Sequence, residues 1–146
     1  MITIGRLAAS DREAWEALFR GYIAFYQRTA PDSMYARAWE KFQADTTVHA
    51  LAARLDGQVA GITHFFTHLS TSAPDSEVCY LQDLFTAPEA RGKGVGRALI
   101  AGVTDWAKER GCTRLYWHTQ ESNATARLLY DQVADYRGFI SYQIDL

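Results

Sequence analysis

Hydrophobic and polar positions repeat along this chain with two different periods, and each change of period predicts a boundary between a strand and a helix. Residues 2–7 alternate with the period of two that is typical of a strand. Apolar residues then recur every three or four positions after the cap signal at Ser10 and Asp11, which predicts a helix as far as Tyr26. A break at residues 31–33 separates this helix from a second one over residues 34–44.

The rest of the chain predicts a hairpin followed by alternating strands and helices. Asp56-Gly57 is a strong hairpin-turn pair between the strands expected at residues 49–54 and 59–68. The expected elements are strands at residues 49–54, 59–68, 77–86, 113–119 and 139–144, a polar loop at residues 70–75, a helix from residue 95 that Gly111 ends, and a helix at residues 123–134. Antiparallel hairpins with one strand–helix–strand crossover predict an α/β fold, a central mixed sheet flanked by helices. A length of 146 residues suits a single domain, residues 1–146.

Composition narrows the class of protein without naming an activity. With 48% hydrophobic and 22% charged residues, the chain is typical of a globular protein. The formal net charge is −2 and no lysine- or arginine-rich block occurs, which argues against a nucleic-acid partner but not against a cationic substrate. Cys79 and Cys112 lie in apolar runs and are expected to be buried thiols in a reducing compartment. No run resembles a signal peptide or a membrane span, so we expect a cytoplasmic protein without a membrane partner.

A glycine-rich turn after the strand at residues 77–86 carries the clearest chemical signal. Gly92, Gly94 and Gly96 alternate with other residues where a helix begins. Glycines let the backbone approach a ligand closely, and a helix start offers unpaired N–H groups and the positive end of the helix dipole. The nearby positive charges are Arg91, Lys93 and Arg97. Together these features predict a pyrophosphate cradle.

Other known phosphate loops fit this turn less well. A dinucleotide-binding fold would carry a glycine where Arg97 stands, and a Walker loop would place Ser or Thr where Gly94 stands. A flexible connecting turn that is merely glycine-rich and basic is the remaining alternative. The arginine at position 91, the preceding Pro88 and a pair of residues farther along the chain favour the cradle.

The turn reads Arg91-x-x-Gly94-x-Gly96, and the second pair is Asn123 with Tyr130 seven residues later. In both motifs the chain resembles the GNAT superfamily of acetyltransferases, closely from about residue 78 onward and by element order before it. Residues 80–84 and 117–123 are most similar to its Hpa-type histone/polyamine branch. The resemblance implies the GNAT acyl-CoA N-acyltransferase fold and acetyl-coenzyme A (acetyl-CoA) as the cosubstrate.

The resemblance also implies where the cosubstrate would lie. Backbone groups of residues 84–86 would hold the acetyl carbonyl and the pantetheine arm. Asn123 would bond the pantetheine chain and Tyr130 would lie near the thioester sulfur, and residues seven apart on a helix can line one wall. The implied cofactor-binding residues are Leu84, Phe85, Thr86, Arg91, Gly92, Lys93, Gly94, Val95, Gly96, Arg97, Asn123 and Tyr130.

Acetyl transfer to an amine needs a neutral amine, a stabilised oxyanion and a protonated sulfur. The backbone N–H of Leu84 is the candidate for the oxyanion. Tyr130 is the candidate for the sulfur; because a tyrosine pKa of about 10 exceeds that of a thiol, full proton donation would be uphill by about 2 kcal/mol. A core tyrosine on an apolar helix face is the alternative interpretation of Tyr130.

The general base stays open. Related enzymes often carry a glutamate where this chain has Gln82, which cannot take a proton. A water chain ordered by Gln82 and backbone carbonyls is the leading interpretation. Asp83 alternates to the other face of the strand, where it is expected to support the sheet or a loop. The side chains that remain as alternatives are Glu77, His118 and Glu121. The four histidines lack metal-like spacing, so no metal is expected.

These features predict an N-acetyltransferase that moves an acetyl group from acetyl-CoA to a primary amine by direct attack in a ternary complex. A small-molecule amine or polyamine is the expected acceptor, and a protein amino group stays open. The aromatic residues of the first two helices either pack in the core or form a wall of the acceptor site. A coenzyme A-binding sensor or interaction module without catalysis is the alternative. The resemblance and the apolar strand expected at residues 139–144 predict a homodimer or higher homo-oligomer.

Overall fold

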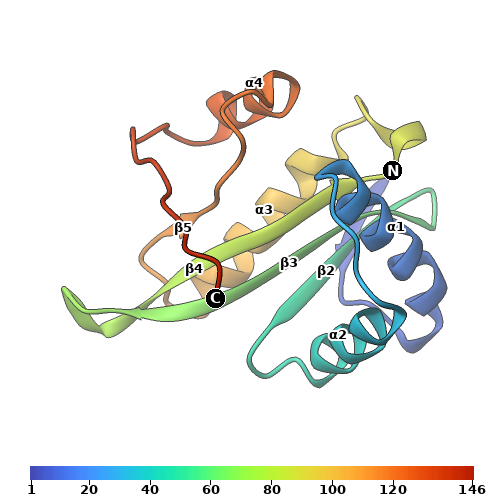
Figure 1. The fold of residues 1–146 in the computed structure, drawn as a ribbon, viewed down its shortest axis with the longest axis horizontal. Coiled ribbons are helices and arrows are strands. Elements are labelled where there is room, and N and C mark those ends of the chain that lie inside the picture. The colour runs from blue at the N-terminus through green and yellow to red at the C-terminus, as the bar shows by residue number, and fades with distance from the viewer.

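A five-stranded sheet forms the centre of the computed structural model, which describes residues 1–146 (Figure 1). Its order follows the chain: β1 (Ile2–Gly5), β2 (His49–Leu55), β3 (Gln58–Ser70), β4 (Ala73–Thr86) and β5 (Leu115–Tyr116). The first four strands pair antiparallel, whereas β5 joins β4 in parallel. The mixed sheet expected from the sequence is therefore confirmed.

The chain forms four helices: α1 (Arg12–Phe25), α2 (Asp32–Ala44), α3 (Val95–Glu109) and α4 (Ala124–Val133). The neighbouring β3 residues His64 and Phe65 identify the two layers, since consecutive side chains of a strand point to opposite faces. His64 contacts rings of α1 and α2, and Phe65 packs against Trp106 of α3, with ring centroids 4.8 Å apart. Helices α1 and α2 thus lie on one face and α3 on the other.

Glycines bring α3 close to the sheet. A Cβ added to Gly61 of β3 would lie 2.6 Å from the Val95 side chain, and one added to Gly102 would lie 2.7 Å from that of Ile4. Such distances are too short for real atoms, so only glycine permits this packing. Because Val95 is the first residue of α3, the contact with Gly61 fixes the start of this helix beside the end of β4.

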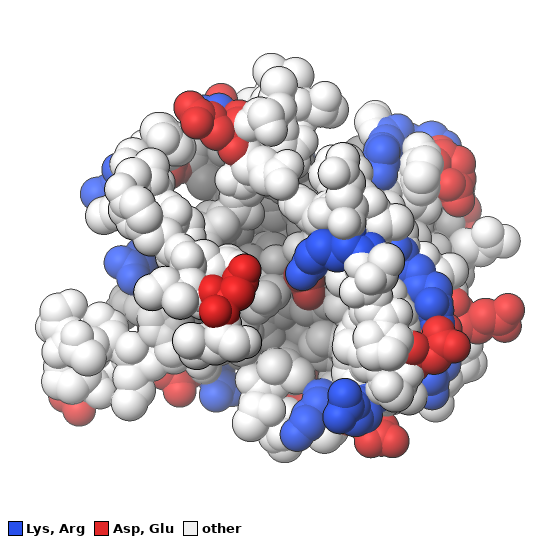
Figure 2. All heavy atoms as spheres, viewed as in Figure 1, with Lys and Arg blue, Asp and Glu red and all other residues white.

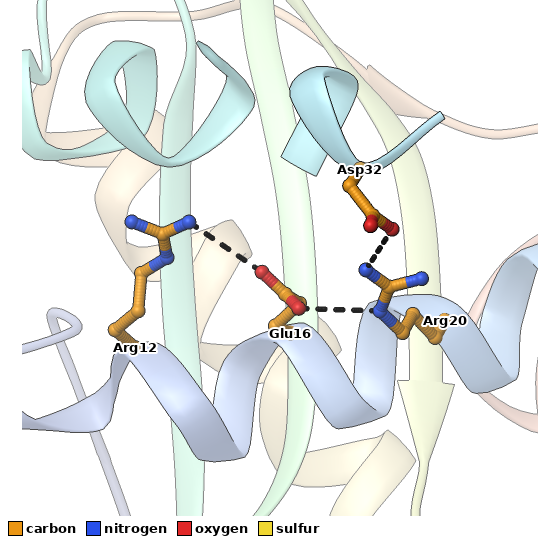
Figure 3. A network of polar contacts seen from close by, with 4 residues as sticks. All are labelled: Arg12, Glu16, Arg20 and Asp32. Carbon is orange, nitrogen blue, oxygen red and sulfur yellow. Dashed lines mark hydrogen bonds and ion pairs between the residues drawn. The ribbon is translucent and has the colours of Figure 1, made fainter. Parts of the chain in front are cut away.

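Ion pairs connect the first two helices (Figure 3). Glu16 pairs with both Arg12 and Arg20 on α1, and Arg20 also bonds Asp32, the first residue of α2, at 2.7 Å. The Arg20 guanidinium lies 4.1 Å from the centre of the Tyr35 ring. These contacts tie α2 to α1, which carries the side chains that cover the end of β4.

Three expected elements differ in the structure. The strand expected at residues 113–119 shortens to β5, because only Leu115 and Tyr116 find partners on β4. The expected loop at residues 70–75 is mostly strand, with the turn confined to Thr71 and Ser72. The closing strand expected at residues 139–144 is absent: the alternating pattern is there, but the segment has no strand beside it, and Phe139, Ile140, Tyr142 and Ile144 are exposed. None of the helices is both long and apolar enough to cross a bilayer.

Candidate active site

The second half of β4 has a neighbouring strand on one side only. β5 pairs with β4 at Cys79 and Tyr80 and then diverges, which leaves residues 81–86 open on that side. The N–H of Ala87 donates to Ala60 O at 2.8 Å, toward β3. Because successive N–H groups of a strand alternate in direction, those of Leu84 and Thr86 point into the opening.

A β-bulge lies at Gln82. His64 pairs with Asp83 and Phe65 pairs with Leu81, so Gln82 has no partner on β3. Its side chain is exposed, and its carbonyl accepts a hydrogen bond from the Tyr22 hydroxyl at 3.4 Å. A bulge bends its strand and redirects the neighbouring side chains, as is common beside functional sites.

The glycine-rich turn continues directly from this open edge. Gly92 and Gly94 have positive φ angles of 76° and 88°, which favour glycine. None of the six backbone N–H groups from residue 92 to residue 97 donates to another backbone group, and the positive end of α3 lies among them. This row of free donors fits the pyrophosphate of a coenzyme A. Figure 2 shows a hollow at the centre of this face of the molecule, between α1 and the segment that carries α4, with a largely uncharged floor.

The three charged side chains of the turn make different contacts. Arg91 donates from Nε to Thr86 O at 3.3 Å and lies over the Phe85 ring, 5.4 Å from its centre. The Arg97 guanidinium bonds the Gln132 side chain of α4. Lys93 forms no ion pair and is exposed. Arg91 and Lys93 are thus beside the row of free N–H groups, whereas Arg97 links α3 to α4.

Helix α4 supplies the opposite wall. Asn123 occupies the N-cap position and donates to Thr119 Oγ1 at 3.2 Å. Tyr130 packs edge-on against Trp117, with ring centroids 5.4 Å apart, and its hydroxyl makes no hydrogen bond within the protein. Burial, and then the nearby Tyr26, raise the pKa of Tyr130 to about 12. The phenol is therefore a neutral hydrogen-bond donor throughout the physiological range.

A buried chain of side chains ends at Asp83. Trp15 Nε1 donates to His64 Nε2 at 2.9 Å, and His64 Nδ1 lies 2.8 Å from Asp83 Oδ2. Burial, followed by the charge of Asp83, raises the pKa of Tyr22 above its usual range. Burial and the charge of Asp83 also raise the pKa of Tyr26. Tyr22 and Tyr26 are among the aromatic residues for which the sequence left an acceptor-site wall open, whereas nothing in the sequence pointed to His64. Its distances along the chain from Trp15 and Asp83 carry no signal of their contact.

The other candidate bases lie in different settings. Glu77 bonds Arg110 at 2.8 Å, which holds the pKa of Glu77 below its usual range. His118 is exposed, with Nδ1 3.3 Å from the Tyr80 hydroxyl. The Glu121 side chain is exposed, and its backbone carbonyl accepts from Arg127 at 2.8 Å. No cluster of three histidine, cysteine or acidic side chains forms a metal-ligand set. Unlike these three residues, Asp83 belongs to a hydrogen-bonded network beside the bulge, so the expectation that it only supports the sheet is revised.

The aromatic residues of α1 and α2 mainly pack in the core. Trp15, Tyr35 and Trp39 are buried, and Phe85 of β4 packs against Gly21. Tyr26 is half-buried. Core packing therefore accounts for most of the aromatic residues.

Comparison with known proteins gives a consistent picture. The model of the acetyltransferase (GNAT) family matches residues 15–136. The chain is 37% identical over 137 residues to the D-amino-acid N-acetyltransferase HPA3 of Saccharomyces cerevisiae, an alignment that covers 91% of this chain and 84% of the yeast protein. The crystal structure of a ribosomal-protein-alanine N-acetyltransferase from Brucella melitensis matches with a TM-score of 0.83 and 27% identity, covering 100% of both chains. The structure of AAC(6')-Iy with a bisubstrate analogue of coenzyme A matches with a TM-score of 0.85 over 100% of this chain and 99% of the other; at 19% identity the likeness is one of fold.

Proposed function

Because the chain belongs to the acetyltransferase (GNAT) family, we propose that it transfers the acetyl group of acetyl-CoA to a primary amine. The observation that carries the proposal is the row of free backbone N–H groups at residues 92–97, which is continuous with the open edge of β4 and lies beside α4, the helix that carries Tyr130. This arrangement suits a cosubstrate with a pyrophosphate at one end and a reactive thioester at the other.

The cosubstrate would lie along the open edge of β4. The N–H groups of residues 92–97, with Arg91 and Lys93, would hold the pyrophosphate. Backbone groups of residues 84–86 would bond the pantetheine arm, and Asn123 would bond it from α4. Acetyl-CoA would supply the acetyl group as an activated thioester. Two cysteines that form no disulfide, Cys79 and Cys112, are in keeping with a cytoplasmic location.

The chain's own groups would then assist the transfer. The Leu84 N–H, which points into the opening, would donate to the carbonyl oxygen as that oxygen gains negative charge. The Tyr130 hydroxyl would donate to the sulfur as it becomes the leaving group. A free alkylamine with a pKa of about 10.4 must lose a proton at a cost of about 4.6 kcal/mol at pH 7. Water ordered by the carbonyl of Gln82 would carry that proton away.

Asp83 would face the acceptor end of this site. Its carboxylate has no lysine or arginine partner, and 15% of its side-chain surface remains accessible. An anionic group among the tyrosines Tyr22 and Tyr26 favours a protonated amine over a neutral or anionic compound. A small cationic amine is therefore the preferred acceptor class. A protein amino group is the second class of acceptor to be tested.

A coenzyme A-binding module without catalysis is the competing function, and Gln82 in place of an acidic residue is the feature that favours it. Release of free thiol from acetyl-CoA separates the two. We expect thiol release that depends on an added amine from a panel of polyamines, D-amino acids, aminoglycosides and lysine peptides. Binding of acetyl-CoA without thiol release from any amine of the panel would favour the module.

A further inference from the structure

The contact between His64 and Asp83 is unusually well defined for a strand histidine. His64 is 2% exposed, stacks on Phe42 with ring centroids 4.0 Å apart, and meets the Phe19 ring edge-on at 4.7 Å. Both ring nitrogens have partners, Trp15 at Nε2 and Asp83 at Nδ1. The imidazole is therefore fixed in position by three rings and two hydrogen bonds.

The Trp15 contact also determines which nitrogen of His64 carries the proton. An indole N–H can only donate, so Nε2 of His64 must accept. The proton of the neutral imidazole then belongs to Nδ1, which donates to Asp83 Oδ2. Protonation of Nε2 would break the bond from a Trp15 side chain that is 0% exposed. His64 is thus arranged to donate a hydrogen bond to the carboxylate and to orient it.

The groups that face Asp83 come from β3 and from the end of α1. His64 of β3 donates to its carboxylate, and the charge of Asp83 raises the pKa values of Tyr22 of α1 and of Tyr26, the residue that follows this helix. The Arg28 guanidinium lies near the tyrosines, 5.9 Å from the centre of the Tyr22 ring and 6.0 Å from that of Tyr26. Arg28 makes no ion pair with Asp83. The carboxylate is held from one side and has no fixed counter-charge on the other.

We propose that His64 is a positioning residue: supported by Trp15, it holds the Asp83 carboxylate in the orientation that binds the protonated acceptor amine. The proposal rests on the proposed acetyltransferase function, because the acceptor defines the site. His64 acts only through Asp83, so it should influence acceptor use and leave the acetyl-CoA site at residues 84–97 unchanged.

Two substitutions of His64 separate shape from hydrogen bonding. His64→Phe keeps a ring that can stack on Phe42 but removes both hydrogen bonds. His64→Gln supplies one acceptor and one donor about as far apart as the two ring nitrogens. A matched control is His49→Phe. His49 is also buried, at 4% exposed, and its Nδ1 bonds Asp45 at 2.6 Å, but it packs against Trp106 on the other face of the sheet.

The measurement is steady-state kinetics with a diamine acceptor, repeated in an Asp83→Asn background. We expect His64→Phe to lower kcat/KM for the acceptor about 10- to 100-fold, the loss expected for a hydrogen bond to a charged group, with the KM for acetyl-CoA within twofold. His64→Gln should recover most of the loss, and His49→Phe should change kcat/KM less than twofold. In the Asp83→Asn background, His64→Phe should have almost no further effect.

Equal losses from His64→Phe in the wild-type and Asp83→Asn backgrounds would overturn the proposal, since His64 would then act independently of the carboxylate. So would a folded His64→Phe variant with wild-type kcat/KM, or an equal loss in the His49→Phe control. A wild-type protein that binds acetyl-CoA but acetylates no amine refutes the proposed function itself, and the positioning role with it. Nitrogen-15 spectra of the imidazole provide a test without turnover: we expect the Nδ1–H form of His64, and the Nε2–H form would contradict the inference.

Discussion

Replacing Tyr130 with Phe removes one hydroxyl from the wall of the active site and little else. The hydroxyl has no hydrogen-bond partner in the protein, so its loss leaves no unpaired group behind. The ring keeps its edge-on packing against Trp117. Any change in turnover therefore reports on the hydroxyl and not on the fold.

The expected magnitude follows from the pKa of this phenol. A value of about 12 lies about 3.5 units above that of an ordinary thiol. Full proton transfer to a free thiolate would be uphill by about 5 kcal/mol, so the phenol can assist only through a hydrogen bond that strengthens as the sulfur gains charge. Loss of such a bond should lower kcat about 10- to 1,000-fold, which corresponds to about 1.4 to 4 kcal/mol.

The assay is acceptor-dependent thiol release together with calorimetric binding of acetyl-CoA. We expect a lower kcat for Tyr130→Phe with nearly unchanged affinity for acetyl-CoA. Tyr136→Phe is the matched control, because Tyr136 is 70% exposed and should change neither quantity. A kcat within twofold of wild type, with chemistry limiting turnover, would make Tyr130 a packing residue.

Four further predictions address other parts of the account. Gly94→Val should abolish acetyl-CoA binding, whereas Gly111→Val, which replaces another glycine of positive φ away from the turn, should retain it; equal affinity in calorimetry would refute the cradle. Gln82→Glu should not impair activity, and the wild-type rate should rise toward the pKa of the acceptor amine without an inflection near pH 6 or 7; a plateau that disappears when Glu77, Asp83, His118 or Glu121 is replaced would contradict the water chain. Folding stability should fall as pH rises from about 9 to 12. Burial raises the pKa of both the Cys79 thiol and the Tyr130 phenol to about 12, so these groups stay neutral in the folded chain while they ionise in the unfolded one; urea midpoints that do not change up to pH 11 would contradict this. The exposed apolar segment at residues 139–144 predicts self-association, and a monomer mass by light scattering at high micromolar concentration would count against it.

The elements that position the cosubstrate could be predicted from the sequence because their signals are local. A strand that ends at Pro88, glycines at positions 92 and 94 and a helical apolar pattern after them describe one continuous piece of chain. The structure adds the positive φ angles and the free N–H groups that such a piece requires.

The acceptor end could not be predicted in this way, because it depends on contacts between distant residues. The bulge at Gln82 changes which face each later β4 side chain takes, and nothing in the alternation of residues 77–86 marks it. His64 and Asp83 lie on the neighbouring strands β3 and β4, where their side chains are in contact. Trp15 of α1, which bonds His64, lies 49 residues earlier in the chain. The segment at residues 139–144 shows the opposite failure: its pattern predicts a strand, yet a strand also needs a neighbour with which to pair.

The most direct test of the central claim follows the acetyl group itself. Acetyl-CoA with a deuterated acetyl group is incubated with the protein and the amine panel, and the amines are analysed by mass spectrometry. The account predicts that the labelled acetyl group appears on the nitrogen of at least one cationic amine with wild-type protein, and not with the Gly94→Val variant. Thiol release without label on any amine, or equal labelling with Gly94→Val, would contradict it.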